Sequence, residues 1–177
     1  MKQTKGLIHI YYGSGAGKST AAFGLALRAA GWGKKVVIVQ FLKSTDCGEV
    51  RMLRGMENIK IYRGHGSLKF SINMTEEEKQ LARCCHNKNL LYALSLIKEG
   101  KYDLLVLDEV LDAAALDLLE SEELRTLMQD ETRTTELVLT GHTKVDWMFD
   151  LADYITRMEK EKHPYDEGLT ARKGIEF

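Results

Sequence analysis

The sequence predicts an α/β domain with a mostly parallel β-sheet flanked by helices. Residues 35–42 form a near-continuous apolar run, which is typical of a strand buried on both faces of a parallel sheet. Residues 102–107 form a second run of this kind. A third strand-like run, residues 7–12, leads through a glycine-rich loop into apolar residues at helical spacing, and this order predicts a strand, a loop and a helix.

The glycine-rich loop after residues 7–12 predicts a site for a nucleoside triphosphate. It consists of Gly13, Ser14, Gly15, Ala16, Gly17, Lys18, Ser19 and Thr20. Glycines let backbone N–H groups turn toward phosphate oxygens at a helix N-terminus, Lys18 adds a positive charge, and Ser19 offers a hydroxyl to Mg²⁺. We therefore expect a P-loop NTPase (RecA-like) domain. The simpler alternative is a glycine turn whose lysine only faces solvent.

The loop differs from two common glycine motifs. It is one residue shorter than G-x-x-x-x-G-K-[ST], because Tyr12 stands where the first glycine would be. The dinucleotide motif G-x-G-x-x-G fails because its third glycine position is Lys18.

Length and composition predict a single domain over residues 1–177, since 44% of the residues are apolar and no linker interrupts the chain. The formal net charge is -1 and basic residues are scattered among acidic ones, so we expect no nucleic-acid partner. No apolar run approaches the ~20 residues of a membrane span. The first residues lead straight into a strand, so we expect no membrane partner and a cytoplasmic location.

The segments that follow the second strand also carry candidate site residues. Residues 43–49 form a polar loop at the edge where open α/β sheets bind ligands, which makes Lys43 and Glu49 candidates; solvent-exposed charges are the alternative. Residues 59–63 predict a half-exposed strand, and we expect the glycine loop 64–70 to lie over the nucleotide.

A long helix is predicted next. Thr75 and Glu78 fit a capping box at its start, and Gly100 marks its end. Within it, the run Cys84, Cys85 and His86 favours packing or surface roles over a metal site, because free cysteine usually behaves as a small buried hydrophobe. The three cysteines of the chain, an odd number with two adjacent, are expected to be reduced.

The strand over residues 102–109 ends in two carboxylates, Asp108 and Glu109. Carboxylates at a strand's carboxyl end, in a chain with a phosphate loop, can hold Mg²⁺ directly or through water. We therefore predict Asp108, Glu109 and Ser19 as ligands of Mg²⁺ or Mn²⁺. The alternative is an acidic helix start.

The remaining elements complete the predicted sheet. We expect a helix capped by Ser121, a strand over residues 136–142, a short helix over 145–151 and a last strand over 154–158. The irregular end that contains Pro164 is expected to lie over the sheet edge.

Taken together, the chain resembles the ATP:corrinoid adenosyltransferases of the cobalamin-biosynthetic type that carry a phosphate loop. The family's loop Gly-Asn-Gly-Lys-Gly-Lys-Thr-Thr is matched by Gly13 to Thr20, and its Val-Val-Gln-Phe strand is similar to Val37-Ile38-Val39-Gln40-Phe41. Further matches are Gly48-Glu49, Leu107-Asp108-Glu109, Leu139-Thr140-Gly141 and the tail from Lys162 through Glu176.

The resemblance implies a reaction in which the Co(I) of a reduced corrinoid attacks C5′ of ATP and expels triphosphate. It implies ATP as co-substrate, with Lys18 and Glu109 as catalytic residues. It also implies a homodimer and a separate reductant, such as a flavoprotein, that makes Co(I).

The chain departs from the family at several positions. Ser14, Ala16 and Ser19 replace the family's Asn, Lys and Thr, so one cation beside the triphosphate is absent. His142, which we assign to nucleotide binding, stands where the family has Arg. The family's aromatic corrinoid loop is also replaced, and we expect Leu68 and Phe70 to supply an apolar wall for the corrinoid.

Two alternative functions stay open from sequence. Thr143-Lys144-Val145-Asp146 mimics the guanine-reading [NT]-K-x-D box of GTPases, although no D-x-x-G motif follows the third strand. A hydrolase, either a GTPase or an ATPase, is therefore one alternative, and a nucleotide-dependent binding switch without catalysis is the other.

Overall fold

A parallel β-sheet forms the centre of the structure, a computed structural model that describes residues 5–43, 46–63 and 74–177. Over these residues the sheet has six strands in the order β3-β2-β4-β5-β1-β6, and every neighbouring pair is parallel. The strands are β1 (Ile8–Tyr12), β2 (Val36–Gln40), β3 (Ile59–Arg63), β4 (Leu104–Asp108), β5 (Glu136–Gly141) and β6 (Tyr154–Arg157). The predicted fold class is confirmed.

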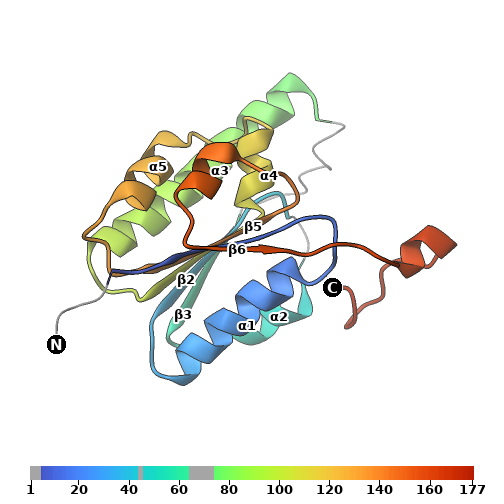
Figure 1. The fold of residues 1–177 in the computed structure, drawn as a ribbon, viewed down its shortest axis with the longest axis horizontal. Coiled ribbons are helices and arrows are strands. Elements are labelled where there is room, and N and C mark those ends of the chain that lie inside the picture. The colour runs from blue at the N-terminus through green and yellow to red at the C-terminus, as the bar shows by residue number, and fades with distance from the viewer. Residues whose placement is uncertain (1–4, 44–45, 64–73) are drawn as a thin grey trace.

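Helices cover both faces of the sheet, as Figure 1 shows. The helices α1 (Lys18–Gly31) and α2 (Gly48–Leu53) lie on one face. The other face carries α3 (Glu76–Lys98), α4 (Val110–Ala115), α5 (Glu122–Gln129) and α6 (Asp146–Asp150). The chain ends in a tail that contains the 3₁₀ helix η2 (Pro164–Glu167) and projects beyond the sheet (Figure 1).

The core consists of two apolar clusters, one on each face of the sheet. The cluster under α1 includes Phe23 and Ile38, and the cluster under α3 to α6 includes Phe41 and Leu107. All five residues of β2 and all five of β4 are buried, which explains their near-continuous apolar sequences.

Most predicted helix boundaries agree with the structure. Thr75 and Glu78 form the capping box at the start of α3, with Glu78 N–H donating to Thr75 Oγ1 at 3.2 Å and Thr75 N–H to Glu78 Oε2 at 2.9 Å. Gly100 follows the helix with a φ of 68°. Ser121 occupies the N-cap position of α5, as predicted, but its side chain makes no capping hydrogen bond.

Helix α2 was not predicted, and α4 was anticipated only by the alternative of an acidic helix start at Asp108 and Glu109. The helix α2 replaces the end of the polar loop, and it buries Val50 and Leu53, which are one turn apart. The helix α4 follows β4 directly, and its short apolar sequence reads as a continuation of the buried strand.

The glycine loop 64–70, with Leu68 and Phe70, lies outside the described residues. Within the ranges given above, none of the helices combines the length and hydropathy that crossing a membrane requires.

Candidate functional site

The glycine-rich loop lies at the carboxyl end of β1, where open α/β sheets bind ligands. Gly13 and Gly17 have φ values of 111° and 96°, which side chains other than glycine rarely adopt. Gly15 is required for a different reason: its N–H donates to Met158 O at 2.8 Å, and a Cβ there would lie 2.8 Å from Glu159 O. The loop is thus built on the segment that follows β6.

The start of α1 can bind an anion. No side chain caps its first N–H groups and no acidic residue occupies its first turn, so free donors and the positive end of the helix dipole face the loop. Lys18 is buried and donates from Nζ to Gly15 O at 2.6 Å. Burial lowers the pKa of Lys18, although Asp112 and Glu109 nearby oppose this effect. The arrangement suits a phosphate chain, as predicted for this loop.

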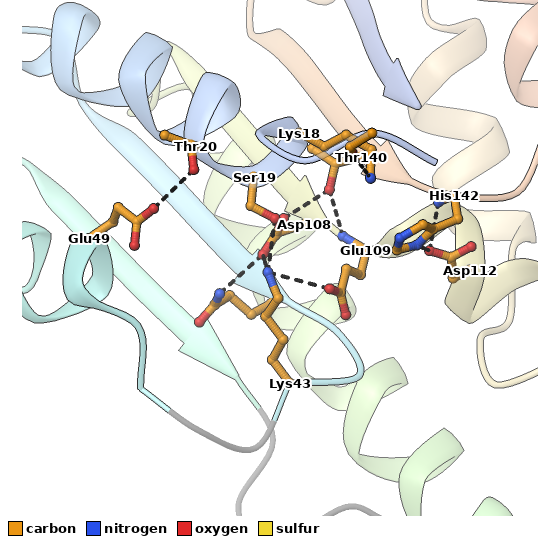
Figure 2. Close-up of polar contacts among 12 residues, drawn as sticks. Lys18, Ser19, Thr20, Lys43, Glu49, Asp108, Glu109, Asp112, Thr140 and His142 are labelled. Carbon is orange, nitrogen blue, oxygen red and sulfur yellow. Dashed lines mark hydrogen bonds and ion pairs between the residues drawn. The ribbon is translucent and has the colours of Figure 1, made fainter. Parts of the chain in front are cut away.

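A second positive charge, the ammonium of Lys43, lies directly below Ser19 in Figure 2. Its Nζ is 2.9 Å from Ser19 Oγ, 2.8 Å from Asp108 Oδ2 and 3.4 Å from Glu109 Oε1. Burial lowers the pKa of Lys43, but the two carboxylates outweigh that effect and raise it overall. The structure therefore brings together the three predicted metal ligands, Ser19, Asp108 and Glu109.

Asp108 is fully buried at the end of β4 and held from both sides. Thr140 Oγ1 donates to its Oδ1 at 2.8 Å, and Gln40 Nε2 donates to its Oδ2 at 3.1 Å. Thr140 Oγ1 also accepts the N–H of Glu109 at 2.8 Å. Glu109 adopts a left-handed φ of 64° between β4 and α4. These contacts hold both carboxylates beside the start of α1.

The oxygen atoms around Lys43 Nζ fit a hard divalent cation. A hydroxyl and two carboxylates already surround a positive charge there, and Mg²⁺ is usually held by one or two carboxylates together with substrate phosphates. In the part of the chain that the structure describes, no group of three or more His, Cys, Asp or Glu residues could hold a metal without such help. Burial raises the pKa of Glu109, and Lys43 partly offsets this.

The other predicted site residues flank this centre. Thr20 Oγ1 donates to Glu49 Oε1 at 3.2 Å, so Glu49, in the first turn of α2, lies beside the loop (Figure 2). On the opposite side, His142 follows β5 and is held by Asp112, whose Oδ2 accepts its N–H at 2.8 Å and lies 3.1 Å from its Nδ1. Hydrogen bonds from His142 and Thr143 outweigh burial and lower the pKa of Asp112 to about 2.

Sequence reasoning missed Asp112 and gave no role to the hydroxyl of Thr140. The signal for Asp112 was its position three residues after Glu109, in the first turn of the helix that follows the strand-end carboxylates. The side chains of the GTPase-like box 143–146 make local contacts in this structure. Thr143 donates to Asp112 through its N–H and its Oγ1, and Lys144 pairs with Asp146 at 2.9 Å.

A cavity of about 800 Å³ lies between the phosphate loop and the C-terminal tail. Its loop side includes Lys18, Ser19 and Thr20, and Glu109 and His142 also line it. The tail contributes Lys162, His163, Pro164, Tyr165, Leu169, Thr170, Ala171, Ile175 and Glu176. The tail therefore forms one wall of the site instead of covering a sheet edge.

The parallel sheet and this loop define a nucleotide-binding protein of the P-loop α/β class. Residues 4–177 match the family model described as ATP:corrinoid adenosyltransferase BtuR/CobO/CobP. The chain belongs to this family.

Curated relatives match over nearly the whole chain. A corrinoid adenosyltransferase of Escherichia coli (strain K12) is 32% identical over 98% of this chain and 86% of its own length. The corrinoid adenosyltransferase CobA of Salmonella typhimurium (strain LT2) is 32% identical over 99% of this chain and 88% of its own. A Pseudomonas aeruginosa corrinoid adenosyltransferase is 30% identical over 99% and 86%.

Proposed function

We propose that the protein transfers the 5′-deoxyadenosyl group of ATP to the Co(I) of a reduced corrinoid and releases triphosphate. The observation that carries this proposal is the juxtaposition of an uncapped helix start and Lys18 with the Ser19–Asp108–Glu109 cluster, in a chain of this family. The names of the relatives support the corrinoid as acceptor.

In the proposed reaction a Co–C5′ bond forms and the C5′–O bond of ATP breaks. Both electrons of the new bond come from Co(I), and the electron pair of the broken bond leaves with the triphosphate. The chain needs no nucleophile of its own, so its task is to orient C5′ and to stabilise the charge of the leaving group. We assign the second task to Lys18 and to the N–H groups at the start of α1.

Mg²⁺, or Mn²⁺ in its place, would be held by Ser19, Asp108 and Glu109 together with triphosphate oxygens. When bound, it would neutralise negative charge on the leaving group. Thr140 and Gln40 keep the Asp108 carboxylate directed at this position.

The remaining walls of the cavity would bind the rest of the substrates. His142 is oriented by Asp112 through Nδ1, which leaves Nε2 to accept a hydrogen bond from a substrate hydroxyl. Tyr165 and Leu169 of the tail offer apolar surface for an adenosine or corrinoid group. Leu68 and Phe70 stay predicted corrinoid contacts.

The likeness to the family also supports a homodimer and a separate reductant, such as a flavoprotein, as proposals. Light scattering of the purified chain tests the first. Reconstitution from Co(III) corrinoid with candidate flavoproteins tests the second. A single domain and a cytoplasmic location stay predictions.

An anaerobic mixture of protein, ATP, Mg²⁺ and chemically reduced cobalamin tests the reaction. We expect the Co(I) absorbance to disappear and one triphosphate to form for each Co–C bond. Inorganic phosphate as the product would instead show a hydrolase. Tight ATP binding without any product would show a nucleotide-dependent switch.

A further inference from the structure

The ammonium of Lys43 lies among the oxygen atoms assigned to the metal ion. It contacts Ser19 Oγ at 2.9 Å and Asp108 Oδ2 at 2.8 Å, and Glu109 Oε1 is 3.4 Å away (Figure 2). The Lys43 side chain is 26% exposed, whereas that of Asp108 is fully buried. The positive charge thus balances a carboxylate that water does not solvate.

The backbone holds Lys43 in this position. Gln40, the last residue of β2, is in register with Asp108 on β4, and Phe41 N–H donates to Asp108 O at 2.9 Å. Leu42 then adopts a left-handed φ of 53°, which a leucine rarely adopts. This turn places Lys43 beside the carboxyl end of β4.

Lys43 Nζ and a metal ion cannot share these oxygen atoms. Mg²⁺ binds oxygen ligands at about 2.0–2.1 Å, so an ion on Ser19 Oγ and Asp108 Oδ2 would occupy the space of the ammonium. Two positive charges so close repel strongly in a partly buried site. One must leave before the other binds.

We propose that Lys43 is an internal cation that occupies the metal position in the nucleotide-free protein and is displaced when the metal arrives with the triphosphate. This inference rests on the proposed metal site. The ammonium keeps the affinity for free divalent cations low, because an entering ion must first break the contacts of Lys43 with Asp108 and Ser19. The negative charge of a triphosphate favours the exchange, since it supplies new ligands to the ion and a new partner for the ammonium.

Binding of Mn²⁺ to nucleotide-free protein, measured by electron paramagnetic resonance of the free ion, tests this proposal without any turnover. We expect Lys43→Gln, which removes the charge but keeps a hydrogen-bond donor, to bind Mn²⁺ at least about tenfold more tightly than wild type. Lys43→Arg keeps the charge and is expected to bind as weakly as wild type. Lys34→Gln is the matched control, because Lys34 pairs at 3.0 Å with Asp103, which precedes β4 at the end of the strand away from the site.

Equal Mn²⁺ affinity in wild type and Lys43→Gln would overturn the proposal, and so would a similar gain in Lys34→Gln. Lys43→Met serves as a second neutral variant. If both neutral variants fold only with Mn²⁺, the ion replaces the lost charge and the proposal stands. If they fail to fold even with Mn²⁺, Lys43 has a structural role that the metal cannot take over, and the proposal fails.

The same experiment separates this inference from the proposed function. Unchanged Mn²⁺ affinity together with normal adenosylation by wild type would reject only the role of Lys43. Tight Mn²⁺ binding by Lys43→Gln, together with wild-type protein that forms no Co–C bond, would reject the transferase activity and keep the exchange.

Discussion

Thr140 Oγ1 donates to Asp108 Oδ1 at 2.8 Å across two neighbouring strands. Thr140 Oγ1 also accepts a hydrogen bond from the N–H of Glu109 at 2.8 Å. One buried hydroxyl therefore orients one strand-end carboxylate and supports the strained turn that carries the other. The metal ligands depend on β5 as much as on β4.

We expect Thr140→Val to lose this support. Valine has a similar shape, but it leaves a buried carboxylate oxygen and a backbone N–H without their partner, which costs ~1–3 kcal/mol for each group. Denaturant unfolding should show the loss, and the Mg²⁺ concentration for half-maximal adenosylation should rise. Thr140→Ser, which keeps the hydroxyl, is the control, and equal behaviour of both variants would contradict this role.

Lys18→Ala should slow adenosylation strongly. Removing one electrostatic donor to a developing negative charge typically costs ~3–4 kcal/mol of barrier, which corresponds to a fall in kcat of roughly 10²- to 10³-fold. Single-turnover decay of the Co(I) absorbance measures the effect. Lys34→Ala should leave the rate unchanged, because Lys34 lies at the amino ends of the strands, away from the site. A Lys18→Ala rate within threefold of wild type would remove Lys18 from catalysis.

Asp108→Asn and Glu109→Gln should each raise the Mg²⁺ requirement, because a neutral amide is a poorer ligand for a hard cation than a carboxylate. Titration of Mg²⁺ at saturating ATP gives the midpoint for each variant. The control is Asp117→Asn, whose parent carboxylate pairs with Arg83 on the protein surface. Unchanged midpoints in both site variants would show that these carboxylates do not hold the ion.

His86 should make the free energy of unfolding depend on pH. Its ring is buried against Phe41 without a hydrogen-bond partner among the described residues, and burial lowers its pKa to about 4 from 6.5. A histidine with a lowered pKa contributes stability above pH 6.5 that is lost as the pH falls toward 4. We expect this residue alone to cost about 2 kcal/mol between pH 7 and pH 5.

Denaturant unfolding of His86→Leu at both pH values measures this contribution. Leucine fills a similar volume and carries no charge, so the variant should lose less stability than wild type over the same pH range. His9→Leu is the comparison, because His9 has a carboxylate partner in Glu136 at 2.6 Å. An identical pH dependence in wild type and His86→Leu would contradict the prediction.

Sequence reasoning predicted the sheet because its strands carry strong signals. The apolar run of β2 and the carboxylates at the end of β4 are typical of strands that are buried on both faces and end at a ligand site. The register of β2 and β4 then places Gln40 opposite Asp108, and this pairing brings together residues that lie far apart in the chain.

The features that sequence reasoning missed depend on such long-range contacts. Lys43 was a candidate only as a charged loop residue, since its contacts arise from the turn at Leu42 and the pairing of β2 with β4. The helices α2 and α4 are six residues each, too short for a clear helical period. The local sequence of the C-terminal tail does not show that it lines the cavity, because its position opposite the phosphate loop is set by tertiary structure.

The hydrogen bond from Gly15 N–H to Met158 O has a consequence for biosynthesis. The loop is made soon after β1, but its backbone partner emerges from the ribosome only after β6 has been made. A nascent chain that stops before Met158 would carry the full glycine motif without the backbone that shapes it. Nucleotide binding would therefore begin only once this segment has been made, and ATP would stabilise the folded domain without trapping nascent chains that lack it.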